Sequence, residues 1–294
     1  MTGLEQSAIL VSYSASTWGG TAPCEAARLD IQEKRGNADG TTRTHVYLVD
    51  EAEIKKNESA FNAAYLFYRA NTIPWETKRG GARLLPGANY QRFKAGIETL
   101  TAAAQDRADE FSANYPRLKG EYEAKLNGLA ATIDPKYYPR PEDMRNQFNI
   151  TVSYSPLPLS PESLTLKFLG RDEFDRLRAQ IAGAWEKQEA AAMGDLYKRL
   201  AQTVAHMATT LANPDKVFRD SMVDNLTELA DLIPALNFKN DPELAELAEI
   251  ARGKLVIDPV ILRQDLIVRG QIAGEAGALL AKITGAGARY IDLT

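Results

Sequence analysis

The sequence predicts a mainly α-helical protein (α+β by strict count), with long antiparallel helices, a β-hairpin between them and a small N-terminal β-sheet. Three observations predict this fold. Two stretches of about 40 residues carry apolar side chains at steps of three and four, the spacing of one helix face. Three Asn-Pro or Asp-Pro pairs in the last third are typical of helix starts. Short alternating segments rich in Thr and Val are typical of strands.

The first part of the chain, residues 1–70, is expected to form an α+β segment. Residues 8–13 and 41–49 are rich in β-branched side chains and predict two strands that meet in a small sheet. A short helix is expected over 23–35, between these strands. Residues 51–69 then predict a longer helix, because their large apolar side chains fall on a common face.

The middle of the chain, residues 71–213, is expected to form a long helical hairpin. One apolar stripe begins at Tyr90, and Pro116 within it removes a backbone donor and predicts a bend. The second stripe begins at Phe174 and continues to Leu211. Each stripe needs a partner that buries it, so an antiparallel pair is the simplest arrangement.

An inserted β-hairpin is expected over residues 148–169, between the two long helices. Residues 148–154 and 164–169 both alternate apolar and polar side chains, as half-buried strands do. A proline-rich linker separates them, so the connecting loop is expected to be long.

The last part, residues 214–294, is expected to be helical and to join the preceding parts in one continuous unit. The Pro pairs predict helix starts near 214, 242 and 259. Small side chains in the final helix have a spacing that allows close contact with another helix. A charged Glu275 among them argues against a membrane-spanning motif. The small residues are Gly270, Ala273, Gly274, Gly277 and Ala281.

The composition excludes several classes of protein. The 294 residues are 45% hydrophobic and carry a net charge of −4, which argues against coating nucleic acid by charge alone. The single cysteine, Cys24, excludes an internal disulfide and a thiolate zinc site. Neither a signal peptide nor an apolar stretch long enough to span a bilayer is recognisable. We therefore expect a cytoplasmic protein without membrane contact.

Four segments, read together, resemble an uncharacterised phage-borne helical protein family, a domain of unknown function. They are NTIPWETKRGGARLLPGANYQRF, FSANYPRL, FNITVSYSPLP and FRDSMVDNLTELADLIPALN. The resemblance runs from about Thr44 to Ile283. It implies a phage or mobile-element setting, and hence a host-cell cytoplasm. It implies no activity, cofactor or catalytic residue.

No catalytic set is recognisable, and no catalytic residue, metal ligand or cofactor is predicted. The only histidines, His45 and His206, lie on a predicted strand and in a predicted long helix. Phosphate-binding glycine motifs are absent. Four acidic residues recur on one face of a single predicted helix. Such a face is typically solvated or pairs with a basic surface of a partner. A metal site is less expected, because metal sites draw their ligands from several elements. The four acidic residues are Asp220, Asp224, Glu228 and Asp231.

The loop over 71–94 interleaves basic and aromatic residues, the combination that contacts single-stranded nucleic acid. A structural loop with packed rings and solvated charges is the alternative interpretation. The candidate nucleic-acid or anion-binding residues are Trp75, Lys78, Arg79, Arg83, Arg92 and Lys94.

These patterns predict a non-enzymatic interaction or scaffold protein that forms a homo-oligomer or binds a protein partner through its long amphipathic helices. A nucleic-acid-binding protein of phage DNA metabolism, acting through residues 75–94, is the alternative hypothesis.

Overall fold

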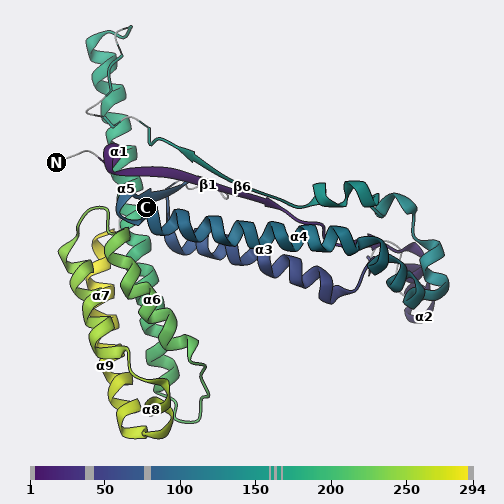
Figure 1. Ribbon diagram of the computed structural model, residues 1–294. Helices are drawn as coiled ribbons and strands as arrows, with labels where there is room; N and C mark the ends of the chain where they lie inside the picture. The colour runs from purple at the N-terminus through teal and green to yellow at the C-terminus, as the bar shows by residue number, and fades with distance from the viewer. Residues whose placement is uncertain are drawn as a thin grey trace. The chain divides into compact units, whose positions relative to one another are not determined.

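A computed structural model describes residues 4–36, 43–75, 81–158, 160–161, 164–166 and 168–290. The described chain is mainly helical with a small antiparallel sheet, which confirms the predicted fold class (Figure 1). It folds into two compact units that interleave along the sequence, so their bounds differ from the three segments 1–70, 71–213 and 214–294. Unit 1 comprises Met1–Ser12, Arg69–Phe93 and Ser153–Thr294, and unit 2 comprises Tyr13–Tyr68 and Lys94–Val152.

The helical part of unit 1 is built around α5 and α9, which run antiparallel (Figure 1). From Trp185 onward, the apolar stripe of α5 is buried in one core together with side chains of α6, α7 and α9. Phe174 and Leu177, at the start of the stripe, are only partly buried and lie outside this core. The helices are α5 (Arg171–Leu211), α6 (Ser221–Leu236), α7 (Pro242–Leu255), α8 (Pro259–Gln264) and α9 (Leu266–Gly287), followed by the 3₁₀ turn η5 (Ala288–Tyr290).

Two of the three predicted helix starts are confirmed. Asp241 and Asp258 each accept hydrogen bonds from backbone N–H groups in the first turn of α7 and α8, with a proline at the first helical position. The start near residue 214 is wrong, because α6 begins at Ser221. The Asn213 side chain instead accepts a hydrogen bond from the Asp215 backbone and folds a turn.

The main sheet has the strand order β4-β5-β1-β6. Strand β1 pairs antiparallel with β5, with Ile9 opposite Leu85. The predicted hairpin over 148–169 is wrong: its first half forms β6, but the described residues of its second half form no strand. Strand β6 lies beside β1 instead. The strands are β1 (Ala8–Ser16), β4 (Ile73–Pro74), β5 (Arg83–Pro86) and β6 (Asn149–Ser155).

The N-terminal strands do not pair with each other as predicted. The strand predicted over 8–13 belongs to the main sheet, whereas β3 (His45–Tyr47) pairs antiparallel with β2 (Thr21–Pro23). Residues 41 and 42 of the predicted second strand lie outside the described residues. The helix predicted over 23–35 is confirmed as α2 (Glu25–Arg35), and a single short turn of helix, α1 (Leu4–Ser7), precedes β1.

Unit 2 is built on an antiparallel helix pair, α3 (Glu51–Asn71) and α4 (Tyr90–Leu126), of which the last residues of α3 and the first of α4 belong to unit 1 (Figure 1). Arg107 pairs with Glu53 at 2.5 Å, and Gly96 faces the ring of Phe67. Helix α4 continues through Pro116. Short 3₁₀ turns follow it: η2 (Asn127–Thr132), η3 (Pro135–Tyr137) and η4 (Pro141–Gln147), and η1 (Gly87–Asn89) precedes it.

No helix within the described ranges is long and apolar enough to cross a membrane.

Candidate interaction surface

The aromatic member of the predicted nucleic-acid loop is a core residue. Trp75 is 4% exposed, and its ring packs edge-on against Trp185 of α5 with 5.5 Å between ring centroids. Its ring is therefore not presented to a base. Lys78 and Arg79 lie outside the described residues.

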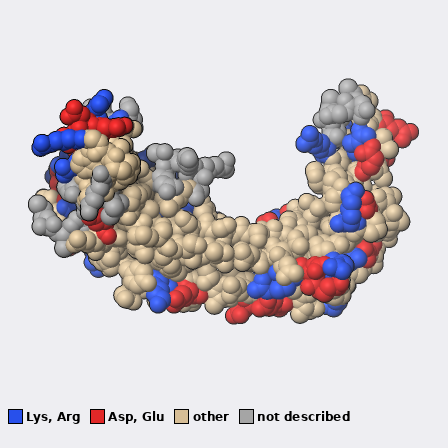
Figure 2. Space-filling view, turned by 90° about the horizontal axis from the view of Figure 1, so that it is seen from above, with Lys and Arg blue, Asp and Glu red and all other residues tan. Residues whose placement is uncertain are grey.

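The basic members of this loop have different surroundings. Arg83 donates hydrogen bonds to the backbone carbonyls of Arg69 and Thr72, and thereby holds the end of α3. Arg92 and Lys94 are exposed, and Lys94 lies 3.9 Å from Glu98. Figure 2 shows basic and acidic side chains next to one another at the ends and along one rim of a mostly uncharged face. The described members of the loop thus do not form one basic and aromatic surface.

The acidic residues of α6 do not gather into a metal site. Asp220 pairs with Arg263 of α8, and Asp231 pairs with Arg252 of α7. In the part of the chain that the structure describes, no three His, Cys, Asp or Glu side chains lie close enough together to hold a metal ion.

The inner face of α9 is anchored by a buried arginine. Arg269 is 5% exposed and donates hydrogen bonds to the carbonyls of Thr210, Leu211, Asn213 and Lys216. These carbonyls lie at the C-terminal end of α5 and in the loop after it, where helical hydrogen bonds are missing. Arg269 therefore fastens the start of α9 to the end of α5.

The far end of α9 is anchored by a buried carboxylate. Asp241 accepts hydrogen bonds from the hydroxyls of Tyr197 and Tyr290 and from Arg289, and its other oxygen caps α7. Burial by itself raises the pKa of Asp241, but these hydrogen bonds outweigh it and hold the pKa below its ordinary value. The turn η5 is thus locked onto α5 and α7.

The outer side of α9 consists mainly of small residues, and its two charged side chains, Glu275 and Lys282, lie along one flank. The other eight exposed positions on this side are uncharged, and all but two are Gly or Ala. We refer to them as the α9 outer face. They are Ile267, Gly270, Gln271, Gly274, Gly277, Ala278, Ala281 and Gly285.

The glycines of the α9 outer face have no packing role among the described residues. A Cβ atom built on Gly270, Gly274, Gly277 or Gly285 would meet no atom of that part of the chain within 4 Å. By contrast, a Cβ on Gly287, which faces inward, would lie 3.1 Å from Tyr197. Only the inward-facing glycine is explained by contacts of α9 with α5.

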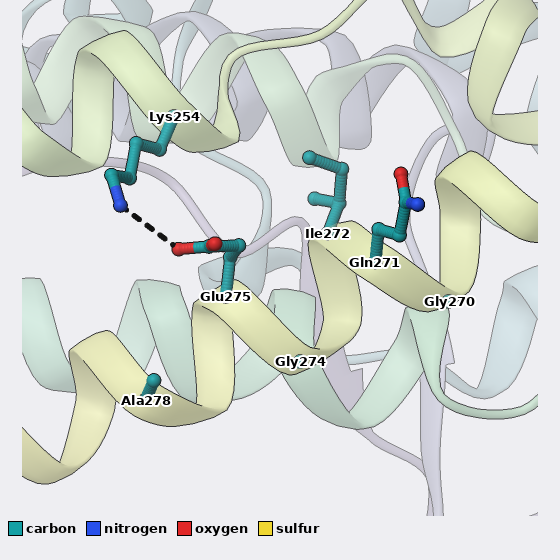
Figure 3. A pocket seen from close by; sticks show the side chains of 7 residues that line it. All are labelled: Lys254, Gly270, Gln271, Ile272, Gly274, Glu275 and Ala278. Carbon is teal, nitrogen blue, oxygen red and sulfur yellow. Dashed lines mark hydrogen bonds and ion pairs between the residues drawn. The ribbon is translucent and has the colours of Figure 1, made fainter.

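A shallow groove runs along this face beside α7 (Figure 3). The groove has a volume of about 700 Å³. Gly270 and Gly274, which have no side chains, line its floor. Lys254 of α7 and Glu275 of α9 form an ion pair at one end, 3.2 Å apart (Figure 3). An open groove beside exposed glycines is better suited to binding a second helix than to enclosing a small molecule.

Large apolar side chains are exposed where α9 begins. Leu266 is 60% and Ile267 is 74% exposed, and Val260 and Ile261 of the preceding α8 are also exposed. Exposed apolar side chains are common singly, but a group of them beside an uncharged helix face marks an interaction surface.

No family model, no curated protein and no solved structure matches the chain. The resemblance to a phage-borne family therefore stays a prediction. The spacing of small residues in the last helix already indicated close helix contact, but the sequence could not distinguish the outward glycines from the inward one. Arg269 gave no signal in the sequence, because its four acceptors are backbone groups more than 50 residues away.

Proposed function

We propose that this protein is a non-enzymatic assembly protein that binds a second copy of itself through the α9 outer face. The observation that carries the proposal is the set of four glycines on the exposed side of a 22-residue helix. The predicted route through the stripe of α5 is replaced, because α6, α7 and α9 bury that stripe from Trp185 to Leu211.

The four glycines weaken α9 as an isolated element. Each Gly in a helix interior is about 1 kcal/mol less favourable than Ala. No contact among the described residues requires these glycines. We infer that a contact with another molecule offsets the free-energy cost of placing them in the helix. Glycine at this spacing lets the backbone of a second helix approach closely, because no side chain keeps the two axes apart.

The centre of the face suits a second copy in the antiparallel direction. Only small residues lie around Ala278 on this face: Gly274, Gly277 and Ala281. A twofold axis near Ala278 brings these small residues of the two copies together, so the two backbones can approach closely.

The charges that flank the face are also self-complementary. Glu275 and Lys282 lie seven residues apart on the same flank of α9, because seven residues make almost two helical turns. In an antiparallel twofold pair each Glu275, which is paired with Lys254 of its own chain, also faces the Lys282 of the other copy. This reciprocity favours a second copy over another protein.

Sedimentation equilibrium tests the proposal. The wild-type chain is expected to show a monomer–dimer equilibrium at micromolar concentration. Gly274→Leu places a large side chain in the centre of the face and is expected to leave only monomer. Its matched control is Gly120→Leu, which replaces an equally open, exposed glycine of α4.

A wild-type chain that remains monomeric at high micromolar concentration contradicts the proposal. So does a dimer that Gly274→Leu and Gly120→Leu weaken equally, because the contact would then lie elsewhere. Circular dichroism of both variants verifies that the helices are retained.

A further inference from the structure

The geometry points to a binding site for a phosphate group in a pocket between the end of α5 and the start of α6. The pocket has a volume of about 220 Å³, which accommodates a tetrahedral oxyanion but not a nucleotide. Its polar lining residues come from both helices and from the loop that joins them. They are His206, Thr210, Lys216, Arg219, Ser221 and Asn225.

A buried hydroxyl in the pocket wall lacks a partner. Thr210 is 2% exposed, and its Oγ1 atom forms no hydrogen bond with any described residue. A buried polar atom without a partner is unfavourable and needs an explanation. An acceptor oxygen bound in the pocket would provide the missing hydrogen bond.

The charged groups of the pocket are positive and unneutralised. The side chains of Lys216 and Arg219 take part in none of the ion pairs or hydrogen bonds of the described chain. Of the two adjacent carboxylates, Asp220 pairs with Arg263, whereas Asp215, next to Lys216, is exposed and does not line the pocket. Behind the loop, the buried Arg269 is bonded to four carbonyls, one of them that of Lys216, and to no carboxylate within the described residues. Arg269 thus fixes the loop and adds positive charge.

The start of α6 contributes a favourable dipole. This helix has 16 residues, and the Asp220 side chain at its N-cap position accepts no capping hydrogen bond. Ser221, its first residue, and Asn225, one turn later, both line the pocket. The N–H groups of Met222, Val223 and Asp224 already donate to backbone carbonyls, so the start of α6 contributes its dipole and not free donors. The ammonium, guanidinium and hydroxyl groups of the pocket supply the donors that match the oxygens of a phosphate group.

The inference does not rest on the proposed self-association, because the pocket uses none of the α9 outer face. The two histidines of the chain provide a direct test. His206 lines the pocket, whereas His45 lies in β3 of unit 2. In NMR spectra of the full chain, titration with inorganic phosphate is expected to shift the imidazole signals of His206 saturably and leave those of His45 unchanged.

A second titration with O-phosphoserine distinguishes the source of the phosphate group. Tighter binding of phosphoserine identifies a phosphate carried by a protein, and tighter binding of inorganic phosphate identifies the free ion. If neither compound moves the His206 signals at millimolar concentration, or if both histidines shift together, the inference is overturned.

Paired variants show which side chains are responsible. The double variant Lys216→Gln/Arg219→Gln is expected to weaken phosphate binding at least about tenfold, because two charge-assisted contacts are lost. Lys187→Gln/Lys198→Gln removes the same charge from exposed positions of α5 and is the control. Equal weakening by both pairs overturns the site, since a general charge effect would then explain the binding.

Thr210→Val tests the buried hydroxyl without changing the shape of the side chain. Phosphate binding is expected to weaken, while the stability of the phosphate-free protein is retained or increased, because an unpartnered hydroxyl is replaced by a methyl group. Unchanged phosphate affinity in a folded Thr210→Val protein contradicts the assigned role of Thr210.

Discussion

The outer faces of α4 and α9 differ in how they meet solvent. On α4, oppositely charged side chains follow one another at helical spacing, as in the pairs Arg107–Glu110 and Arg117–Glu121. On α9 the charged side chains Glu275 and Lys282 lie along one flank, and the α9 outer face beside them is uncharged and built mainly of Gly and Ala. Both helices pack on an antiparallel partner, so burial of the inner face does not explain the difference. A charged outer face is the usual surface of a helix in water, whereas an uncharged one indicates a further contact.

The glycines of the two helices show the same contrast. Gly96 of α4 faces inward, and a Cβ built there would lie 2.1 Å from the ring of Phe67. Its small size is required by packing inside unit 2. Gly270 and Gly274 of α9 face outward into open space. The role of a helical glycine therefore depends on the face on which it lies.

The largest expected effect is on the free energy of unfolding, when the contacts that hold the inner faces of α9 and α4 are removed. Arg269→Met removes a buried guanidinium and leaves four carbonyls without their donor, so the free energy of unfolding is expected to fall by about 3 kcal/mol. Arg107→Met in α4 removes a partly exposed ion pair and is expected to cost about 1 kcal/mol. Urea unfolding of both variants measures the difference. Equal losses would show that the carbonyl contacts of Arg269 contribute little.

Asp241 anchors the end of α9, and Asp241→Asn is expected to cost about 2 kcal/mol at neutral pH. The carboxylate is only 6% exposed and accepts bonds from two tyrosines and Arg289. The pKa of Asp241 is lower in the folded chain than the ordinary value of about 3.9 in the unfolded chain. Its contribution to stability is therefore fully present above about pH 4 and is lost as pH falls through the folded pKa.

Thermal unfolding of wild type and Asp241→Asn at several pH values measures this contribution. The difference in stability between the two proteins is expected to be constant from about pH 5 to 7 and to shrink below about pH 4. A difference that persists unchanged at low pH would mean that the carboxylate charge is not responsible.

The same substitution is expected to have opposite effects on the two helices. Gly96→Ala should destabilise unit 2 by about 1 kcal/mol or more, because the new Cβ forces the ring of Phe67 to move. Gly274→Ala should stabilise the monomer by up to about 1 kcal/mol, because helix propensity improves in open space. Unfolding is compared at concentrations low enough to keep the chain monomeric. Destabilisation by Gly274→Ala would reveal an internal contact at this position.

The smallest expected effect comes from the charges that flank the α9 outer face. Glu275→Lys is expected to weaken self-association about threefold, as is Lys282→Glu, because like charges then face each other in the pair. The double variant Glu275→Lys/Lys282→Glu is expected to restore the wild-type dissociation constant at low salt. Additive weakening in the double variant, measured by sedimentation, would argue against the antiparallel alignment.

The local part of the fold could be predicted from the sequence. The stripe beginning at Phe174 predicts α5 within three residues of its observed start at Arg171, and the Asp-Pro pairs predict α7 and α8. Long-range features could not be predicted, because no local pattern specifies the partner. Strand β6 therefore lies beside β1 rather than in the expected hairpin.

The candidate site was predictable only in part, for the same reason. The spacing of small residues in the last helix indicated close packing against another helix. Which of them point outward depends on the side of α9 that packs against α5, and no local pattern specifies that side. Trp75 and the nearby basic residues have the composition of a nucleic-acid site, yet the buried ring of Trp75 packs against Trp185. Composition indicates which chemistry is available, and burial decides whether it is accessible.

Disulfide cross-linking at Ala278 tests the occupancy of the α9 outer face most directly. Ala278 lies near the midpoint between Glu275 and Lys282, so an antiparallel twofold pair brings the two copies of this residue together. Ala278→Cys is expected to form a covalent dimer under mild oxidation, and Gly120→Cys on α4 is expected to remain monomeric. If Ala278→Cys stays monomeric, or if both variants cross-link at the same rate, a second copy does not occupy this face.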